Sequence, residues 1–275
     1  MSETPIFIDD HLLRVGTADF YCAFPLDNAP EGLLPVMKGR PLVERYIALT
    51  RALRPTTIVE LGIRRGGSTA LLCALTDPTK LIAVEISRGP APALRDYVEQ
   101  QGLADVIRPY YGVDQSDRTR LSAIITDEFG GGSIDLVIDD ASHRYRETLS
   151  SFETLFPHLR AGGLFVIEDW NGDHLVGDLV HHVLLDRTRP DHDHVEQQLQ
   201  AARAAQRADP ETMQIPLTQL AVELLLARAS SGDAIREVTV SYEWVVIERG
   251  SEALDPETFR LSDLVHDHFG FTTRP

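Results

Sequence analysis

The chain has 275 residues, of which 43% are hydrophobic and 25% are charged, as is typical of a globular protein. Its formal charge of -16 at pH 7 comes from 42 acidic residues against 26 basic ones, so its surface should repel phosphate backbones and anionic lipid head groups. Nucleic acid and anionic membranes are therefore not expected as partners. The two cysteines have no metal-ligand spacing and indicate neither a disulfide framework nor a zinc cluster.

The first forty residues carry no sustained hydrophobic period. They begin acidic without a basic leader, and no apolar run in the chain approaches the roughly 18 residues that span a bilayer. We therefore expect a cytoplasmic location and a reducing compartment. Residues 1–40 contain prolines among aromatic residues, which indicates an ordered arm or lid, or equally an extension that covers the edge of the core.

From residue 41 onward, helical and strand patterns alternate. We expect strands at 58–62, 81–84, 106–112, 135–139 and 164–168, with helices at 41–53, 70–75, 116–129 and 145–159. This alternation predicts an α/β fold, a doubly wound and mostly parallel sheet within one catalytic domain over residues 41–250.

The second half of this domain is less regular. Residues 171–215 should form a helical insertion in which 195–208 is helical and the polar stretch 174–194 is a mobile, solvated loop. A metal tract is the alternative for four histidines of this stretch, His181, His182, His192 and His194. Beyond it we expect a helix at 217–229, an antiparallel strand pair at 235–242 and 244–250, and a weakly patterned tail at 251–275.

Acidic residues mark the carboxyl ends of the first two expected strands. Glu60 enters a turn that contains Gly62, Gly66 and Ser68, and Glu85 ends the second strand. Glycine lets the backbone pass close to a ligand, and a carboxylate suits a cationic amino group better than it suits a pyrophosphate. An acid at the position of Glu85 commonly accepts hydrogen bonds from ribose hydroxyls. The pattern predicts a site for a nucleoside with an ammonium-bearing tail.

Over about residues 41–250 the chain resembles the class I S-adenosylmethionine methyltransferases, which implies a Rossmann-like fold with a seven-stranded sheet. The resemblance implies that Glu60, Gly62 and Gly66 hold the amino-acid part of the cofactor, that Glu85 holds the ribose, and that Asp114 and Gln115 lie beside the adenine. Ser68 in the turn and Asp139 at a later strand end are assigned to the same cofactor site. The alternatives are solvated strand ends for Glu60 and Glu85, and a helix cap for Asp114.

A second motif joins two strand ends. Asp139-Asp140-Ala141-Ser142-His143 follows one strand, and Glu168-Asp169 follows the next. The motif resembles the metal-dependent sugar O-methyltransferases of macrolide and related antibiotic tailoring, although that family commonly has glycine where this chain has Ala141. The resemblance implies that His143 is a catalytic base and that three residues bind magnesium, Asp140, Glu168 and Asp169. It also implies a homo-oligomer acting on a small-molecule acceptor, a glycosylated natural product.

The chemistry of such a site agrees with these residue types. An aliphatic hydroxyl is a very weak acid, and a hard divalent cation held by carboxylates can bind two neighbouring hydroxyls and lower the pKa of one. A histidine can take the proton near neutral pH. The alternative is that Asp139 or Asp140 caps a helix and that His143 merely begins it. The neighbours Arg144, Tyr145 and Trp170 could contact the acceptor, and for the two aromatic residues packing is an equal alternative.

Two other functions remain open at this point. An NAD-linked oxidoreductase would use the same sheet, but the glycine spacing and the acid in the first turn disfavour it. A cofactor-binding module without catalysis is disfavoured by the intact set of Asp140, His143, Glu168 and Asp169.

Overall fold

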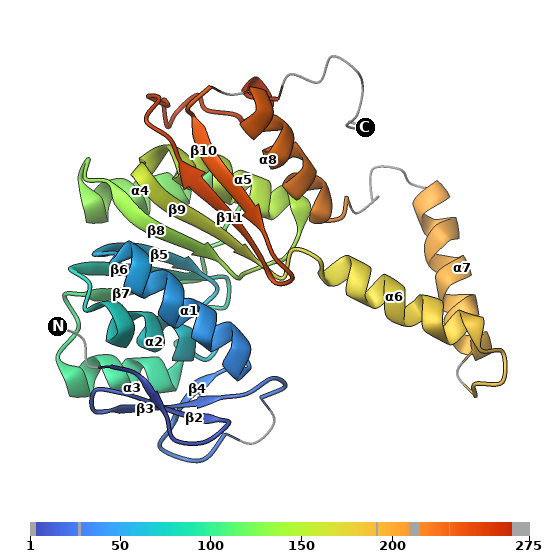
Figure 1. Cartoon of the computed structure of the whole chain (residues 1–275), viewed down its shortest axis with the longest axis horizontal. Coiled ribbons are helices and arrows are strands. Elements are labelled where there is room, and N and C mark those ends of the chain that lie inside the picture. The colour runs from blue at the N-terminus through green and yellow to red at the C-terminus, as the bar shows by residue number, and fades with distance from the viewer. Residues whose placement is uncertain (1–3, 27–28, 191, 209–214, 231, 266–275) are drawn as a thin grey trace.

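The computed structural model describes residues 4–26, 29–190, 192–208, 215–230 and 232–265 (Figure 1). Its centre is a sheet of seven strands, namely β5 (Thr57–Leu61), β6 (Lys80–Glu85), β7 (Ile107–Tyr111), β8 (Ile134–Asp139), β9 (Leu159–Glu168), β10 (Ile235–Val240) and β11 (Trp244–Arg249). Their order is β10-β11-β9-β8-β5-β6-β7, and only β11 runs antiparallel to its neighbours β9 and β10. The strand order reverses between β5 and β8, which is where open α/β sheets bind ligands. The predicted fold class is confirmed.

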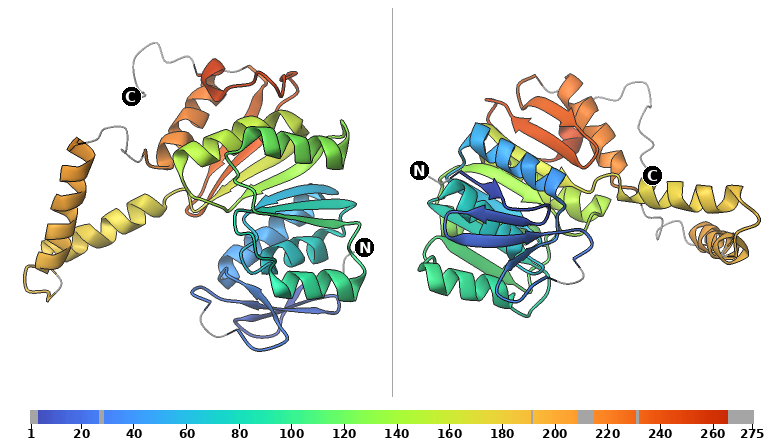
Figure 2. Two further views of the ribbon diagram at one scale, coloured as in Figure 1. Left: turned by 180° about the vertical axis from the view of Figure 1, so that it is seen from behind. Right: turned by 60° about the horizontal axis from the view of Figure 1, so that its bottom comes forward.

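Helices cover both faces of this sheet (Figures 1 and 2). One face carries α1 (Arg40–Leu53), α2 (Gly67–Thr76) and α3 (Pro92–Gln101), and the other carries α4 (Arg118–Phe129), α5 (Tyr145–Leu155) and α8 (Thr218–Ser230). Adjacent residues of β5 belong to opposite cores, Ile58 to the first and Val59 to the second, because successive side chains of a strand point to opposite faces.

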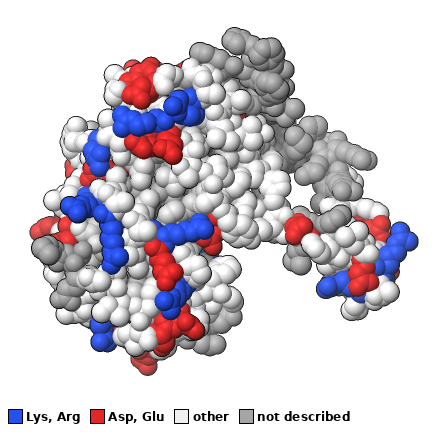
Figure 3. Space-filling model, viewed as in Figure 1, with Lys and Arg blue, Asp and Glu red and all other residues white. Residues whose placement is uncertain are grey.

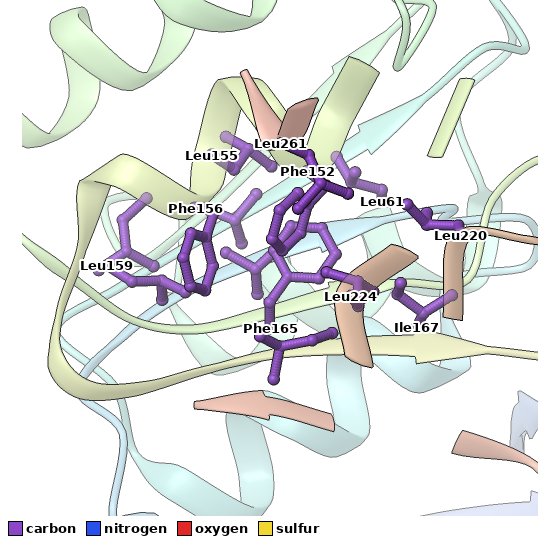
Figure 4. Close-up of a cluster of buried hydrophobic side chains, with 14 of the residues drawn as sticks. Leu61, Phe152, Leu155, Phe156, Leu159, Phe165, Ile167, Leu220, Leu224 and Leu261 are labelled. Carbon is purple, nitrogen blue, oxygen red and sulfur yellow. The ribbon is translucent and has the colours of Figure 1, made fainter. Parts of the chain in front are cut away.

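The core on the α5 and α8 face is aromatic at its centre (Figure 4). The ring of Phe152 stacks on Phe156 at 4.6 Å between centroids and meets Phe165 of β9 edge-on at 5.2 Å. All three side chains are fully buried. The expected weakly patterned tail contributes here too, since Phe259 and Leu261 are buried in the same core. Residues 266–275 lie outside the described part of the chain.

The N-terminal segment, which we expected to be an ordered arm or lid or an extension over the edge of the core, is a small sheet. It contains β1 (Ile6–Phe7), β2 (Leu12–Val15), β3 (Ala18–Cys22) and β4 (Leu34–Val36) in sequential order. Leu13 and Phe20 are fully buried in the core that also contains α1 and α2. At the start of α2, a Cβ on Gly67 would lie 2.1 Å from the carbonyl oxygen of Pro35, so β4 sits against that helix at a distance that only glycine permits.

The expectation of a mobile loop over 174–194 is wrong. This stretch forms most of α6 (Gly172–Leu185) and the beginning of α7 (His192–Ala208), and the two helices project from the body of the molecule (Figures 1 and 2). The helix forms because apolar residues recur through α6 between its histidines, so the polar composition was misleading. Asp191, residues 209–214 and the side chain of His181 lie outside the described structure.

The other histidines of this stretch do not form one cluster. His182 contacts the carbonyl oxygen of Asp178 at 2.8 Å, whereas His194 contacts Gln198 at 3.0 Å. His192 lies 2.9 Å from Asp193, and these two side chains with Glu196 form a small group of possible metal ligands at the start of α7. The described side chains therefore give no support to a four-histidine metal tract.

Acidic and basic side chains are interspersed on the face of the molecule shown in Figure 3. No helix among the described residues has the length and apolar content needed to cross a membrane.

Candidate active site

A cavity of about 1100 Å³ opens at the carboxyl ends of β5, β6, β8 and β9. Its wall combines the turn after β5, the ends of β6 and β8, the beginning of α6 and the segment between β4 and α1. Single-ligand sites usually enclose about 300–1000 Å³. The cavity is therefore large enough for two ligands side by side.

Gly62, Gly66 and Ser68 line the cavity at the turn after β5. Gly62 has a φ of 98°, and a Cβ at this position would lie 2.2 Å from the carbonyl oxygen of Asp140. No other residue fits there without displacing the end of β8. Gly62 thus joins the turn after β5 to the acidic end of the neighbouring strand.

Glu60 lies beneath this turn and does not line the cavity, contrary to the expectation that it touches the cofactor. It is 1% exposed and accepts hydrogen bonds from Ser68 and Thr69 at the start of α2. Burial raises the pKa of Glu60 to about 7, although the two hydroxyls lower it. Its carboxylate is positioned to hold α2 against β5, since its hydrogen-bond partners come from that helix.

Glu85 and Asp114 both line the cavity. The carboxylate of Glu85 accepts hydrogen bonds from the backbone N–H groups of Ile63, Arg64 and Ser87 at 2.7–3.1 Å. Burial alone would raise the pKa of Glu85, but these donors outweigh it and lower the pKa below its ordinary value. Asp114 accepts hydrogen bonds from Ser116, whereas the cap of α4 is Asp117, so the helix-cap alternative for Asp114 does not hold.

Asp139 is the second expected cofactor residue that the structure places behind the cavity wall. It is 2% exposed and accepts hydrogen bonds from Ser151 at 2.5 Å and from Gln115 at 3.0 and 3.1 Å. Burial raises its pKa to about 6. Gln115 does line the cavity, and its side-chain oxygen Oε1 accepts a hydrogen bond from the backbone N–H of Ser142 at 2.9 Å. Gln115 therefore links Asp139 to the start of the acidic motif.

Three side chains of that motif converge at the other end of the cavity. Asp140, His143 and Asp169 each offer a possible metal ligand atom, and these atoms lie within 4.8 Å of one another. His143 Nε2 is 3.7 Å from the nearer oxygen of Asp140 and 4.0 Å from that of Asp169. Two carboxylates beside an imidazole are donors that suit a hard divalent cation such as magnesium. The side chains present fit the metal that the sequence implied.

The backbone is strained at two of these residues. His143 has a φ of 53° and Asp169 a φ of 50°. Among the described residues, the other non-glycine positions with positive φ are Arg64, which lines the cavity, and Arg54 and Asp77, which end helices. Strained backbone concentrates at functional sites, so its occurrence at three residues that line the cavity supports a functional role for the cavity.

Glu168, the third expected metal ligand, has both carboxylate oxygens engaged by other side chains. Oε2 accepts a hydrogen bond from Lys38 Nζ at 2.8 Å, and Oε1 accepts one from the hydroxyl of Tyr46. The same ammonium group donates to Asp140 Oδ2 at 2.6 Å. Burial alone would lower the pKa of Lys38, but Glu168 and Asp140 outweigh it and raise the pKa above its ordinary value.

The residues that flank the motif divide between the cavity and the core. Arg144 lines the cavity, whereas Tyr145 and Trp170 pack against the core. The Tyr145 hydroxyl donates to Glu223 on α8, and Trp170 Nε1 donates to the carbonyl oxygen of Ser241 at 2.9 Å. The packing alternative is correct for both aromatic residues.

Several cavity residues had no local signal in the sequence. They come from the N-terminal segment, the start of α1 and the β10–β11 turn, and include Phe24, Met37, Lys38, Leu42, Tyr242 and Glu243. None of them lies near a recognisable motif. Only Lys38 had a weak signal, because the chain has two lysines, Lys38 and Lys80, beside 24 arginines.

Residues 59–170 match a family model described as a methyltransferase domain. The matched span runs from β5 to the residue after Asp169, so it contains the glycine turn and the whole acidic motif. The matched span therefore contributes residues to both ends of the cavity.

Characterised proteins with similar sequences share parts of this domain. The chain is 38% identical over 74 residues to demethylmacrocin O-methyltransferase of Streptomyces fradiae, which is 22% of this chain and 19% of that protein. It is 32% identical over 137 residues to an 8-demethyl-8-(2-methoxy-alpha-L-rhamnosyl)-tetracenomycin-C 3'-O-methyltransferase of Streptomyces olivaceus, covering 47% of this chain and 31% of that protein. The matches thus span less than a third of either relative.

A solved structure shares the fold. MycE methyltransferase from the mycinamycin biosynthetic pathway, in a complex with Mg, SAH and mycinamycin VI, superimposes with a TM-score of 0.51 at 23% identity. The superposition covers 76% of this chain and 49% of MycE. It agrees with the seven-stranded, Rossmann-like methyltransferase fold.

Proposed function

We propose that the protein is an S-adenosylmethionine- and magnesium-dependent O-methyltransferase that acts on a hydroxyl of a sugar or similar diol in a natural product, as in antibiotic tailoring. The observation that carries the proposal is the convergence of Asp140, His143 and Asp169 in the same cavity as the glycine turn and Glu85. The named relatives, which are O-methyltransferases for demethylmacrocin and for a rhamnosyl tetracenomycin, support this choice of reaction and substrate class.

One end of the cavity holds the methyl donor. Gly62, Gly66 and Ser68 lie along its amino-acid part, Glu85 accepts hydrogen bonds from its ribose, and Asp114 with Gln115 lies beside its adenine. Glu60 and Asp139 act from behind the wall, because neither side chain reaches the cavity. Their hydrogen bonds to Thr69 and Gln115 keep these walls in place.

The other end holds and activates the acceptor. Asp140 and Asp169 hold the cation, and His143 lies beside both carboxylates as the general base. When bound, magnesium supplies a Lewis acid that orients two neighbouring hydroxyls and lowers the pKa of one. His143 takes the proton of that hydroxyl as the hydroxyl oxygen attacks the methyl group, the sulfur–methyl bond breaks, and S-adenosylhomocysteine is left. Such a general base is typically worth about 10²–10⁴ in rate.

The test is methyl transfer from S-adenosylmethionine to a panel of glycosylated macrolides and rhamnosides, followed by mass spectrometry with magnesium or with a chelator. We expect one added methyl group with magnesium, none with chelator, and at least about a hundredfold slower transfer by H143A. Full activity in chelator or in H143A would contradict the proposal.

Calorimetric titration separates the alternative functions. We expect S-adenosylhomocysteine to bind and NAD not to bind. Binding of NAD alone would indicate the oxidoreductase. Binding of S-adenosylhomocysteine without transfer to any diol of the panel would indicate the module without catalysis.

A further inference from the structure

Lys38 places a buried positive charge at the acidic end of the cavity. The residue lies between β4 and α1, is 5% exposed, and its ammonium contacts Asp140 at 2.6 Å and Glu168 at 2.8 Å. The other oxygen of Glu168 is bound by Tyr46, whose ring lies 5.3 Å from the same ammonium. Lys38 and Tyr46 together engage both oxygens of Glu168.

The segment that carries Lys38 is fixed in place. The carbonyl of Pro35, three residues earlier, lies against Gly67, and α1 begins two residues later at Arg40. Tyr46 projects from the same α1 and is fully buried. Lys38 is therefore fixed by β4 before it and by α1 after it, so its ammonium group stays beside the two carboxylates.

We propose that Lys38 is a counter-cation that pairs with Glu168 and prevents it from binding the metal. Asp140 and Asp169 are then the two carboxylates that hold the divalent cation. Lys38 is thus a positioning residue that sets which acids bind the metal. The inference rests on the proposed function in one respect, that a divalent cation binds at this edge.

The chemistry of magnesium agrees with two protein carboxylates. Magnesium keeps several waters and is usually held by one or two carboxylates together with oxygens of the substrate. Asp140 and Asp169 would leave coordination positions for two hydroxyls of a diol. The carboxylate of Glu168 would occupy one of these positions, but its contact with Lys38 keeps it from binding the metal.

The electrostatics point the same way. Three carboxylates at one edge repel one another, and a buried carboxylate is stable only when it is paired. Lys38 neutralises one of these charges without metal, so Glu168 remains buried and satisfied before the metal binds. Removing the ammonium would release Glu168 and leave the edge more negative, which strengthens its attraction for a divalent cation.

The test compares two single variants by titration with Mn²⁺, followed by calorimetry and by electron paramagnetic resonance of the free ion. E168Q and D169N each remove one carboxylate and keep Lys38, so both change the net charge by the same amount. We expect D169N to bind Mn²⁺ at least about tenfold more weakly than E168Q, because Lys38 already withholds Glu168 from the metal. The single variant K38M should bind at least about tenfold more tightly.

The controls separate a local effect from unfolding. K80M removes the only other lysine, which pairs with Glu128 at 2.7 Å far from the cavity, and should leave Mn²⁺ affinity unchanged. Thermal unfolding and circular dichroism of each variant establish that it is folded at the temperature of titration.

Three results would overturn the inference. They are weaker binding by E168Q than by D169N, equal binding by these two variants, and no gain in affinity by K38M. If the wild type binds no Mn²⁺, the metal dependence of the proposed function fails. In that case binding gained by K38M would still support the inference, and no binding by K38M would overturn it.

Discussion

The two ends of the cavity hold their carboxylates in different ways. At the end that we propose for the methyl donor, which we call the donor end, the carboxylates of Glu60, Glu85 and Asp139 accept hydrogen bonds from hydroxyls, backbone N–H groups and an amide. All of these groups are uncharged. At the acidic end, Asp140 and Glu168 are held by an ammonium group. Uncharged hydrogen-bonding groups keep a carboxylate in place without changing the charge of the site. The carboxylates of the acidic end instead need a positive charge, from Lys38 or from a metal, to balance their own.

The largest effect should come from removing one charge at the acidic end. D140N loses one of the two cation ligands that we propose and the partner of Lys38, so methyl transfer should fall by about a hundredfold or more. The dissociation constant of S-adenosylhomocysteine should stay within about threefold, because the donor end is bound by other groups. Steady-state kinetics and calorimetry measure the two quantities.

Its control is D96N, the same change on the exposed surface of α3, which should alter neither quantity. An equal loss of turnover and of cofactor affinity in D140N would show that the two ends are not separable.

A smaller effect should follow at the junction between the ends. In G62A the new methyl group would lie 2.2 Å from the carbonyl oxygen of Asp140, and the φ of 98° is unfavourable for alanine. We expect the free energy of unfolding to fall by roughly 2–4 kcal/mol and S-adenosylhomocysteine to bind about tenfold more weakly. Urea denaturation and calorimetry test both. G89A, where the new methyl group meets no atom within 4 Å, is the matched control, and equal effects of the two changes would contradict the argument.

The smallest effect concerns pH and the buried acid of the donor end. Burial raises the pKa of Glu60 from 4.5 to about 7, so its contribution to stability is complete below pH 4.5 and is lost as the pH rises through about 7. E60Q stays neutral at every pH. Its free energy of unfolding should match the wild type near pH 5 and exceed it by about 1–2 kcal/mol near pH 8.

Urea denaturation at the two pH values measures this difference. E257Q, at an exposed position, should show no such pH dependence. Lower stability of E60Q than of the wild type at pH 8 would show that the buried carboxylate is charged and stabilising.

The large sheet could be predicted because its strands are continuous apolar runs that are buried on both faces. Leu136, Val137 and Ile138 of β8 are all fully buried, and the acids that follow mark the carboxyl end. Since parallel strands end at one edge, the positions of Glu85, Asp140 and Asp169 around one cavity followed from the same pattern.

Short or mixed segments could not be predicted in this way. The strands β1 to β4 have two to five residues each and are stabilised by contacts with α1 and α2, which lie elsewhere in the sequence. In α6, the histidines and aspartates hid an apolar helical pattern. Composition misleads where a few apolar positions decide the structure.

The contacts of the site were the least predictable part. Lys38 and Glu168 are 130 residues apart, and Tyr46 and Glu168 are 122 apart. Both pairs form only because α1 and the segment that precedes it pack on the sheet. The orientation of Glu60 was missed for a related reason, since its partner Thr69 belongs to the next helix.

The scarcity of lysine has a practical consequence. Apart from Lys38, the only lysine is Lys80 on β6, whose side chain pairs with Glu128. Protein grown with lysine labelled with carbon-13 at Cε would therefore give two side-chain signals, one from the cavity and one from a remote ion pair. The first would report on the binding of the proposed ligands in the cavity, and the second serves as an internal reference, so a spectrum with two signals follows the cavity without any added probe.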